Sequence, residues 1–235
     1  DIDVAWVDYF LYQTYERLGE YERAGSMLER GISILEKHCT DAPERIIEWI
    51  TDAGRFGEML KRDDIAESYY RRALQVAERV YGELHEKLIN PNLVLADFYV
   101  LIDENRRAEP FYRRATNIAY RTLPPMDENF AATLFKAGAF FYKQGDYAKA
   151  KKCFQTTLSI DEHNRGADSV ENIYTLQYLG LILDVDGDAA AAEKCFLRSI
   201  AIAELHEGHD SDKLISLHRD LGRCANNVQQ TKHPA

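Results

Sequence analysis

The chain has 235 residues, of which 46% are hydrophobic and 29% are charged, a composition typical of a protein that buries a core. Its formal net charge is −10 and its Lys and Arg residues are scattered, so the basic stripe of a nucleic-acid binder is missing. No apolar run approaches the ~20 residues that a membrane-spanning helix needs. We therefore expect neither nucleic acid nor a membrane among its partners.

Small residues recur every 42 positions along the chain, and large residues follow them at constant distances. A small residue, a large one four positions on, a small one after three more and a β-branched one after another three share one face of an α-helix. We call this helix B of each repeat. The series are Ala24, Ala66, Ala108, Ala150 and Ala192; Leu28, Tyr70, Tyr112, Phe154 and Phe196; Gly31, Ala73, Ala115, Thr157 and Ser199; and Ile34, Val76, Ile118, Ile160 and Ile202.

A second helix, helix A, precedes each helix B with the same period. Where two helices cross closely, only Gly, Ala or Ser leaves room for the backbones, and a large neighbour fills the space beside the crossing. Helix A shows this combination of an apolar residue with an adjacent, mostly small one. The two series are Leu11, Ala53, Leu95, Ala137, Leu179 and Leu221, and Tyr12, Gly54, Ala96, Gly138, Gly180 and Gly222.

In chain order, the period predicts antiparallel helix pairs at about 4–40, 43–82, 86–124, 127–166 and 168–208, and a terminal helix at 210–229. We expect turns between helices A and B at Gly19, Gly145 and Gly187, where helix-forming residues lapse. One hairpin cannot bury its apolar face alone, so neighbours stack. The expected fold is a single all-α domain, a right-handed superhelical solenoid. Because the chain starts with Asp1 and not with Met, we expect it to be a fragment of a longer protein.

These motifs resemble the tetratricopeptide repeat, which has small residues at the helix crossing, Gly in the A–B turn and Ala-x-x-x-aromatic-x-x-Ala in helix B. The segments Gly145–Phe154 and Ala66–Ala73 carry the resemblance. The 42-residue length and the segment Tyr69–Gly82 are similar to the kinesin-light-chain type of repeat. The resemblance covers nearly the whole chain. It implies a binding platform and not an enzyme, and it leaves the ligand to be argued separately.

Kinesin-light-chain repeats usually carry an Asn pair just before the Leu of helix A, which clamps the backbone of a cargo peptide. This chain has no Asn at any of the matching positions, so the resemblance does not imply the same cargo motif. The positions hold Tyr9–Phe10, Thr51–Asp52, Leu93–Val94, Phe135–Lys136, Gln177–Tyr178 and Arg219–Asp220.

Stacked hairpins of this kind curl so that helices A line the concave side of the superhelix. Residues of helix A just outside the packing set are then expected to face a groove and to offer aromatic anchors and polar groups to a peptide. Aromatic residues at helical spacing also pack often against a neighbouring repeat. We predict that a protein or peptide partner contacts Tyr9, Gln13, Arg55, Asp97, Phe135, Tyr142, Tyr174, Gln177 and Arg219.

The first predicted helix carries aromatic residues around most of its circumference, at Trp6, Tyr9, Phe10, Tyr12 and Tyr15. A terminal repeat usually presents a polar outer face. Either more protein precedes this helix, or its surface binds a partner or a second copy of the chain. The alternatives to peptide binding are therefore self-assembly as a homo-oligomer and a role as the regulatory or sensor arm of a larger multidomain protein.

The cysteines are explained by the repeat and not by redox or metal chemistry. Cys153 and Cys195 are one period apart, and helices that stack about 8–10 Å apart are too distant for a disulfide. Cys39 and Cys224 lack a nearby second cysteine that a zinc site would need. We expect free thiols, which favour a cytoplasmic location.

Two acidic or histidine-rich segments have the appearance of metal sites. The segment 206–210, His-Glu-Gly-His-Asp, lies at a junction between repeats, and the segment 184–188, Asp-x-Asp-Gly-Asp, lacks the closing Glu of a calcium loop. We interpret both as ordinary junction and turn residues. No catalytic motif is present, so we expect no catalytic site, no metal and no cofactor.

Overall fold

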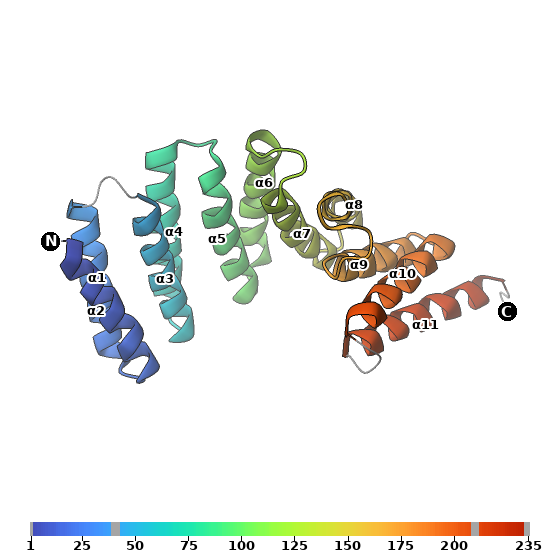
Figure 1. The fold of residues 1–235 in the computed structure, drawn as a ribbon, viewed down its shortest axis with the longest axis horizontal. Coiled ribbons are helices and arrows are strands. Elements are labelled where there is room, and N and C mark those ends of the chain that lie inside the picture. Colours follow the sequence, from blue (N-terminus) through green and yellow to red (C-terminus); the bar gives the residue numbers. More distant parts are fainter. Residues whose placement is uncertain (1, 39–42, 208–211, 233–235) are drawn as a thin grey trace. The chain divides into compact units, whose positions relative to one another are not determined.

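The structure is a computed structural model that describes residues 2–38, 43–207 and 212–232. Within these ranges it contains α-helices, one 3-10 helix and no strand, which confirms the predicted all-α repeat fold (Figure 1). The helices form five antiparallel pairs and a final single helix. They are α1 Ile2–Arg17, α2 Tyr21–His38, α3 Pro43–Met59, α4 Asp63–Tyr81, η1 Glu86–Leu88, α5 Ile89–Leu101, α6 Asn105–Thr122, α7 Glu128–Lys143, α8 Tyr147–Arg165, α9 Asn172–Val185, α10 Ala189–Glu207 and α11 Asp212–Lys232.

All five turns between the helices of a pair share one backbone geometry. A residue with positive φ stands at each turn, and the next residue donates its N–H to the carbonyl five positions earlier at 2.8–2.9 Å, as in a Schellman cap. The turns predicted at Gly19, Gly145 and Gly187 are therefore confirmed. The other two turns use Lys61 and Asp103, which lie on the same 42-residue step.

Small residues lie where the two helices of a pair cross, as the register predicts. A Cβ on Gly180 would lie 2.7 Å from Cε1 of Phe196, and a Cβ on Gly138 would lie 3.1 Å from the ring of Phe154. Both distances are shorter than ordinary van der Waals contact, so these helices approach as closely as they do because the side chain is absent. The alanines that begin the helix-B pattern are all fully buried.

The chain divides into two compact units, unit 1 at residues 1–122 and unit 2 at residues 123–235. Unit 1 contains the pairs α1/α2, α3/α4 and α5/α6. Aromatic residues of α3 fill the space next to α1: the ring of Trp49 stacks on Tyr9 with centroids 4.4 Å apart, and Phe56 meets Tyr12 edge-on at 5.6 Å. On α2, Gly31 leaves room for Trp49, because a Cβ there would lie 3.1 Å from the indole.

Unit 2 contains the pairs α7/α8 and α9/α10 together with α11. One face of α11 packs on the last pair, where Leu214 and Leu217 join the buried Ile173 and Cys224 joins the buried Phe196. No helix in the described part of the chain is both long and apolar enough to cross a membrane.

Candidate functional site

The face that helices A present in unit 1 is built around Tyr9. Its hydroxyl donates to Asp52 Oδ2 at 2.6 Å, and Asp52 Oδ1 accepts from Arg55 at 3.0 Å. Burial and the neighbouring Asp52 carboxylate raise the pKa of Tyr9, while a hydrogen bond with Gln13 acts in the opposite direction. The structure thus brings the predicted residues Tyr9, Gln13 and Arg55 together around a carboxylate, and the Tyr9 ring forms part of the core next to Trp49.

Asp97, the fourth predicted residue of unit 1, belongs to a different contact. It accepts a hydrogen bond from the Tyr112 hydroxyl of the same helix pair. Burial and this carboxylate raise the pKa of Tyr112. Asp97 therefore orients a core tyrosine and does not join the cluster around Tyr9.

In unit 2, aromatic rings from α7 and α9 gather on the side formed by helices A. The Tyr178 ring stacks on Phe154 at 4.7 Å, meets Tyr142 at 5.2 Å and meets Phe135 at 6.0 Å. Tyr142 also contacts Tyr147 at 5.5 Å. Phe135, Tyr142 and Tyr178 are half-buried, and burial raises the pKa of both tyrosines.

Polar side chains from α9 and α11 adjoin these rings. Gln177 Nε2 donates to Ser216 Oγ at 3.0 Å and to Asp220 Oδ2 at 2.8 Å, and Arg223 lies 3.4 Å from Asp220. The contact of Tyr178 with Tyr142 joins α9 to α7, and the hydrogen bond of the adjacent Gln177 with Asp220 joins α9 to α11, so the three helices form one surface. We call it the helix-A face of unit 2; it comprises Phe135, Tyr142, Tyr174, Gln177, Tyr178, Ser216, Arg219, Asp220 and Arg223.

Two of the predicted residues lie at the exposed part of this face. Tyr174 is 45% exposed, and the Lys213 ammonium group lies 5.3 Å from the centre of its ring. Arg219 is exposed and makes no hydrogen bond or ion pair with another described residue. Both side chains are therefore open to a ligand.

Tyr178, Asp52 and Asp220 are central contacts that the sequence prediction did not include among the site residues. The signal was present, because all three occupy the second position of the pair that holds Asn in kinesin-light-chain repeats. That position points between neighbouring helices A, as the Tyr9–Asp52 and Gln177–Asp220 hydrogen bonds show. A comparison that looks only for Asn at this position does not detect the tyrosine and the two aspartates that occupy it in this chain.

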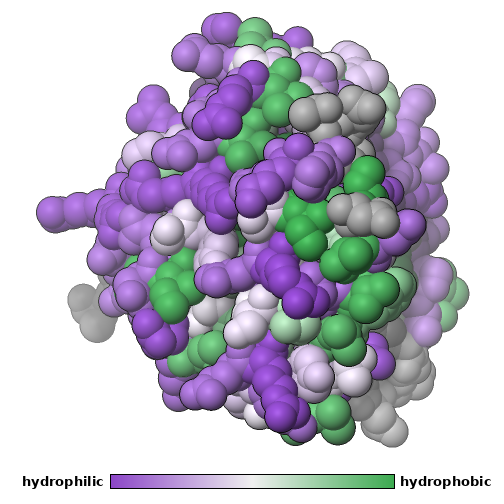
Figure 2. Space-filling view, turned by 90° about the vertical axis from the view of Figure 1, so that its left-hand side faces the viewer, coloured by the Kyte–Doolittle hydropathy of each residue, from purple (hydrophilic) through white to green (hydrophobic). Residues whose placement is uncertain are grey.

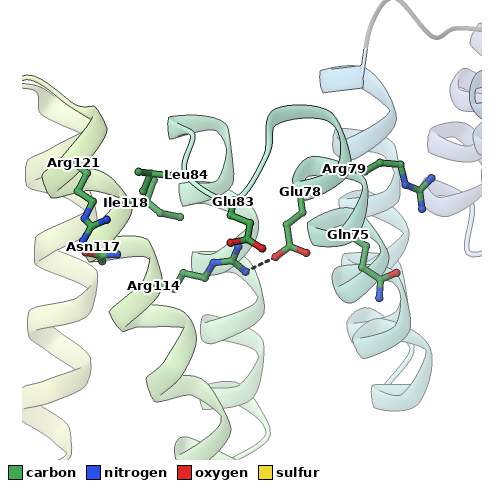
Figure 3. A pocket seen from close by; sticks show the side chains of 9 residues that line it. All are labelled: Gln75, Glu78, Arg79, Glu83, Leu84, Arg114, Asn117, Ile118 and Arg121. Atoms are coloured by element: carbon green, nitrogen blue, oxygen red, sulfur yellow. Dashed lines mark hydrogen bonds and ion pairs between the residues drawn. The ribbon is translucent and has the colours of Figure 1, made fainter.

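A cavity of about 810 Å³ lies in unit 1 between α4, the segment after it, and α6. In Figure 3, Arg114 reaches Glu78, Glu83 lies beside this ion pair, and the Arg79 side chain is directed away from it. Two carboxylates thus stand next to the guanidinium at the centre, so this cavity does not provide a concentrated positive charge for an anion.

The tetratricopeptide repeat family model matches residues 54–121 and 129–204, more than half of the chain. The chain belongs to the tetratricopeptide repeat family. A comparison with curated protein sequences finds no match.

Solved structures with this tetratricopeptide fold include BtubC (BKLC) from P. vanneervenii, with 20% identity, a TM-score of 0.71, and 86% of this chain and 80% of that chain covered. A putative kinesin light chain from Podosopora anserina with nearly identical TPR-like repeats has 13% identity and a TM-score of 0.68, covering 88% and 99% of the two chains. A Rap protein complexed with competence and sporulation factor has 17% identity and a TM-score of 0.59, covering 97% and 64%. At these identities the likeness concerns the fold.

The first tetratricopeptide helix, α1, is less aromatic on its surface than predicted. Trp6 packs edge-on against Trp49, with ring centroids 5.4 Å apart. Tyr12 is buried, and Tyr9 and Tyr15 are half-buried against the apolar core that α1 shares with α2 and α3. Of the five predicted aromatic residues only Phe10 is exposed, and it is joined by Val4 and Val7. Figure 2 views the molecule from the side where α1 and α2 lie in Figure 1 and shows apolar patches separated by polar atoms.

The described cysteines of these tetratricopeptide helices are free thiols, as expected. Burial raises the pKa of Cys153 and of Cys224 to about 11. Cys39 and residues 208–211 of the histidine-rich segment lie outside the described residues. Within the described ranges, no group of three or more His, Cys, Asp or Glu side chains is placed to hold a metal ion.

We expect Cys153 and Cys224 to resist alkylation by iodoacetamide at pH 8 in the folded chain, because the thiolate is the reacting species and both thiols stay protonated. In urea at the same pH both should react. Mass spectrometry of tryptic peptides measures this. Alkylation of either residue at the same rate with and without urea would contradict the buried position.

Proposed function

We propose that the chain is a protein-interaction scaffold that binds an extended peptide segment along the helix-A face of unit 2. The observation that carries the proposal is the cluster of half-buried rings Phe135, Tyr142 and Tyr178 beside the polar Gln177 and Asp220. Aromatic side chains in a supported cluster supply most of the binding energy at interfaces, and neighbouring polar groups orient the bound backbone.

The exposed part of this face adds a preference for the ligand. The Arg219 guanidinium lacks a described ion-pair partner, and Tyr174 offers an exposed ring. A planar guanidinium pairs well with a carboxylate. The preferred segment thus combines an apolar side chain for the ring cluster with an acidic side chain. The Rap structure complexed with competence and sporulation factor supports the proposal, since that protein has the same fold and holds a bound partner.

A peptide selected on the intact chain from a displayed random library should lose affinity by about thirtyfold when Tyr174 or Tyr142 is replaced by alanine. The estimate corresponds to ~2 kcal/mol for an aromatic anchor. Isothermal titration calorimetry measures the affinity, and far-ultraviolet circular dichroism checks that each variant is folded.

The matched control is Tyr120→Ala, which removes a tyrosine of comparable exposure from a helix B of unit 1. This variant should bind the selected peptide as tightly as the original chain. Equal affinity of Tyr174→Ala, Tyr142→Ala and the original chain would show that the peptide binds elsewhere.

A second candidate function is self-assembly through α1. Val4, Val7 and Phe10 are 42%, 55% and 62% exposed, whereas Ile46 and Trp49, which stand 42 residues after the two valines, are buried. A second copy that covers α1 would bury these side chains. Light scattering of the chain and of Val7→Lys tests this: a concentration-dependent dimer that the substitution dissociates supports self-assembly, and a monomer at millimolar concentration contradicts it.

We also propose a cytoplasmic location. The described cysteines Cys153, Cys195 and Cys224 are free thiols, and such thiols persist in reducing compartments. Fluorescence microscopy of a tagged chain in its native cell tests the location, and secretion of the tag would contradict it.

A further inference from the structure

A second pocket in unit 1 lies between α2, α3 and α4 and has a volume of about 270 Å³. Leu28, Phe56 and Gly57 belong to its lining and are buried. Leu60 and Tyr69 line it as well and are only partly buried, so the pocket is open to solvent. The space between the first two helix pairs is therefore accessible and has an apolar wall.

The 42-residue register explains why this space is empty. Gly57 belongs to a series in which most repeats have a large side chain: Tyr15, Gly57, Tyr99, Phe141, Leu183 and Ala225. Tyr99 is fully buried in the pair α5/α6, and Phe141 is 5% exposed in the pair α7/α8. The pair α3/α4 thus lacks the aromatic ring that the next two pairs bury.

The neighbours of Tyr99 match the lining of the pocket. The Tyr99 ring lies 5.6 Å from that of Phe98 and 5.7 Å from that of Phe111. Its hydroxyl donates to Glu67 at 2.9 Å and accepts from Arg71 and Arg107. These five neighbours stand 42 residues after five residues that all line the pocket, namely Phe56, Tyr69, Gly25, Glu29 and Ile65. The pocket therefore has the surroundings of a buried tyrosine ring without the ring.

This gap arises inside the array of repeats and not at one of its ends. The contacts of Tyr99 come from α4, α5 and α6, which are the preceding helix B and both helices of its own pair. The three matching helices, α2, α3 and α4, are all present around the pocket. The ring that fills the site belongs to helix A of the pair itself, so by this register a further repeat before α1 or after α11 supplies no side chain here.

The polar end of the pocket differs from that of the Tyr99 site. Arg71 and Arg107 donate to the Tyr99 hydroxyl at 2.7 Å and 2.9 Å. Glu29 and Ile65 stand 42 residues before these arginines and line the pocket. A carboxylate and an apolar side chain thus replace two cations.

Glu29 is placed to accept a hydrogen bond from a ligand. It accepts one from the Tyr69 hydroxyl at 2.7 Å, which holds it at the pocket, and a carboxylate has room for further donors. Among the described residues that line the pocket, Arg62 alone is basic, and it lies 3.7 Å from Asp64. The pocket therefore favours a ring that donates a hydrogen bond over a ring that carries a negative charge.

We propose that this pocket binds a small phenol, whose ring lies between Phe56 and Gly57 and whose hydroxyl donates to Glu29. The volume favours a single ring, because pockets for drug-sized ligands span about 300–1,000 Å³, and an apolar cavity of about 150 Å³ already takes up benzene. The site lies in unit 1, so the inference does not rest on peptide binding to the helix-A face of unit 2.

The test uses p-cresol, which is the tyrosine side chain as a free molecule, and the intact chain. Fluorine NMR of 4-fluorophenol is the readout: its resonance should broaden when the chain is added, and p-cresol should displace it with a dissociation constant of about 1 mM or below. Gly25→Leu should weaken both ligands at least tenfold, because the new side chain occupies the pocket. A Cβ at Gly25 lies 3.4 Å from the Phe56 ring, an ordinary contact, and circular dichroism should show this variant folded.

Gly222→Leu is the matched control, since it makes the same substitution at a helical glycine of unit 2 where an added Cβ meets no described heavy atom within 4 Å. It should bind p-cresol like the original chain. Glu29→Leu changes an exposed residue and should weaken p-cresol about fivefold while leaving toluene, which has no hydroxyl, unchanged.

Two further ligands test the chemistry of the site. The anion 4-methylbenzoate should bind at least tenfold more weakly than p-cresol. N-acetyl-tyrosinamide carries the same phenol on a peptide-like backbone, and tighter binding of this compound than of p-cresol would overturn the proposal in favour of a partner's tyrosine side chain. Failure of p-cresol to displace 4-fluorophenol, or equal binding by Gly25→Leu, would also overturn it.

Discussion

Replacing Trp49 with alanine is expected to lower the free energy of unfolding of unit 1 by about 3–5 kcal/mol. Trp49 is 2% exposed, stacks on Tyr9 at 4.4 Å and meets Trp6 at 5.4 Å. The missing indole leaves a cavity between the first two helix pairs, and helices held by their own turns close it only in part. Because neighbouring hairpins stabilise each other, both pairs should become less stable.

The measurement is straightforward because the only two tryptophans, Trp6 and Trp49, both lie in unit 1. In the Trp49→Ala variant, Trp6 fluorescence reports the urea unfolding of unit 1, and circular dichroism reports all helices. Trp49→Phe is the matched control and should cost less, since a ring remains to contact Tyr9. A loss below 1 kcal/mol for Trp49→Ala would show that the indole does not support the packing of the two pairs.

Two glycines at equivalent positions should respond to alanine in opposite directions. Gly180→Ala places a Cβ 2.7 Å from the Phe196 ring and should lower the stability of unit 2 by about 1–3 kcal/mol. Gly222→Ala places its Cβ in open space and should raise the stability by about 0.5–1 kcal/mol, because alanine favours the helix. The backbone effect is the same in both cases, so packing decides the sign.

Thermal unfolding followed by circular dichroism measures the pair. A change of 1 kcal/mol corresponds to about 2–4 °C in Tm for a domain of 150–250 residues. Gly180→Ala should unfold at a lower temperature than the original chain, and Gly222→Ala at a higher one. A rise in Tm for both would mean that the Phe196 ring moves aside freely and that the crossing is loosely packed.

The helical pairs were predictable because each repeat carries the same spacing of small and large residues. The aligned alanines and the glycine–aromatic pairs, such as Gly138 with Phe154, place helices A and B and their contacting faces without knowledge of the structure. The turns at Lys61 and Asp103 were less visible. Lys61 is not a residue type that favours a left-handed backbone, and aspartate, as at Asp103, adopts it less readily than glycine, so the two helices that each turn joins set its conformation.

Only part of the candidate site was predictable. Each contact in the site joins side chains of two helices, whereas the 42-residue register gives only the face of one helix on which a residue lies. The register predicts Tyr142 and Gln177 as site residues, and both lie on the helix-A face of unit 2. It also predicts Asp97, but this carboxylate accepts a hydrogen bond from the hydroxyl of the core residue Tyr112. Whether a half-buried polar residue faces a ligand or an inner tyrosine depends on side-chain reach, which spacing does not encode.

The common geometry of the five A–B turns gives the chain equivalent positions at which repeats could be joined. Each turn has one left-handed residue, the same capping hydrogen bond and the same place in the 42-residue step. An excision from Lys61 to Asp103 would therefore join two segments that already share turn conformation and helix phase. We therefore expect the backbone to tolerate the removal or duplication of a whole repeat at these turns without a new linker, while the contacts between neighbouring repeats, such as Tyr9 with Asp52, would change with the new neighbour.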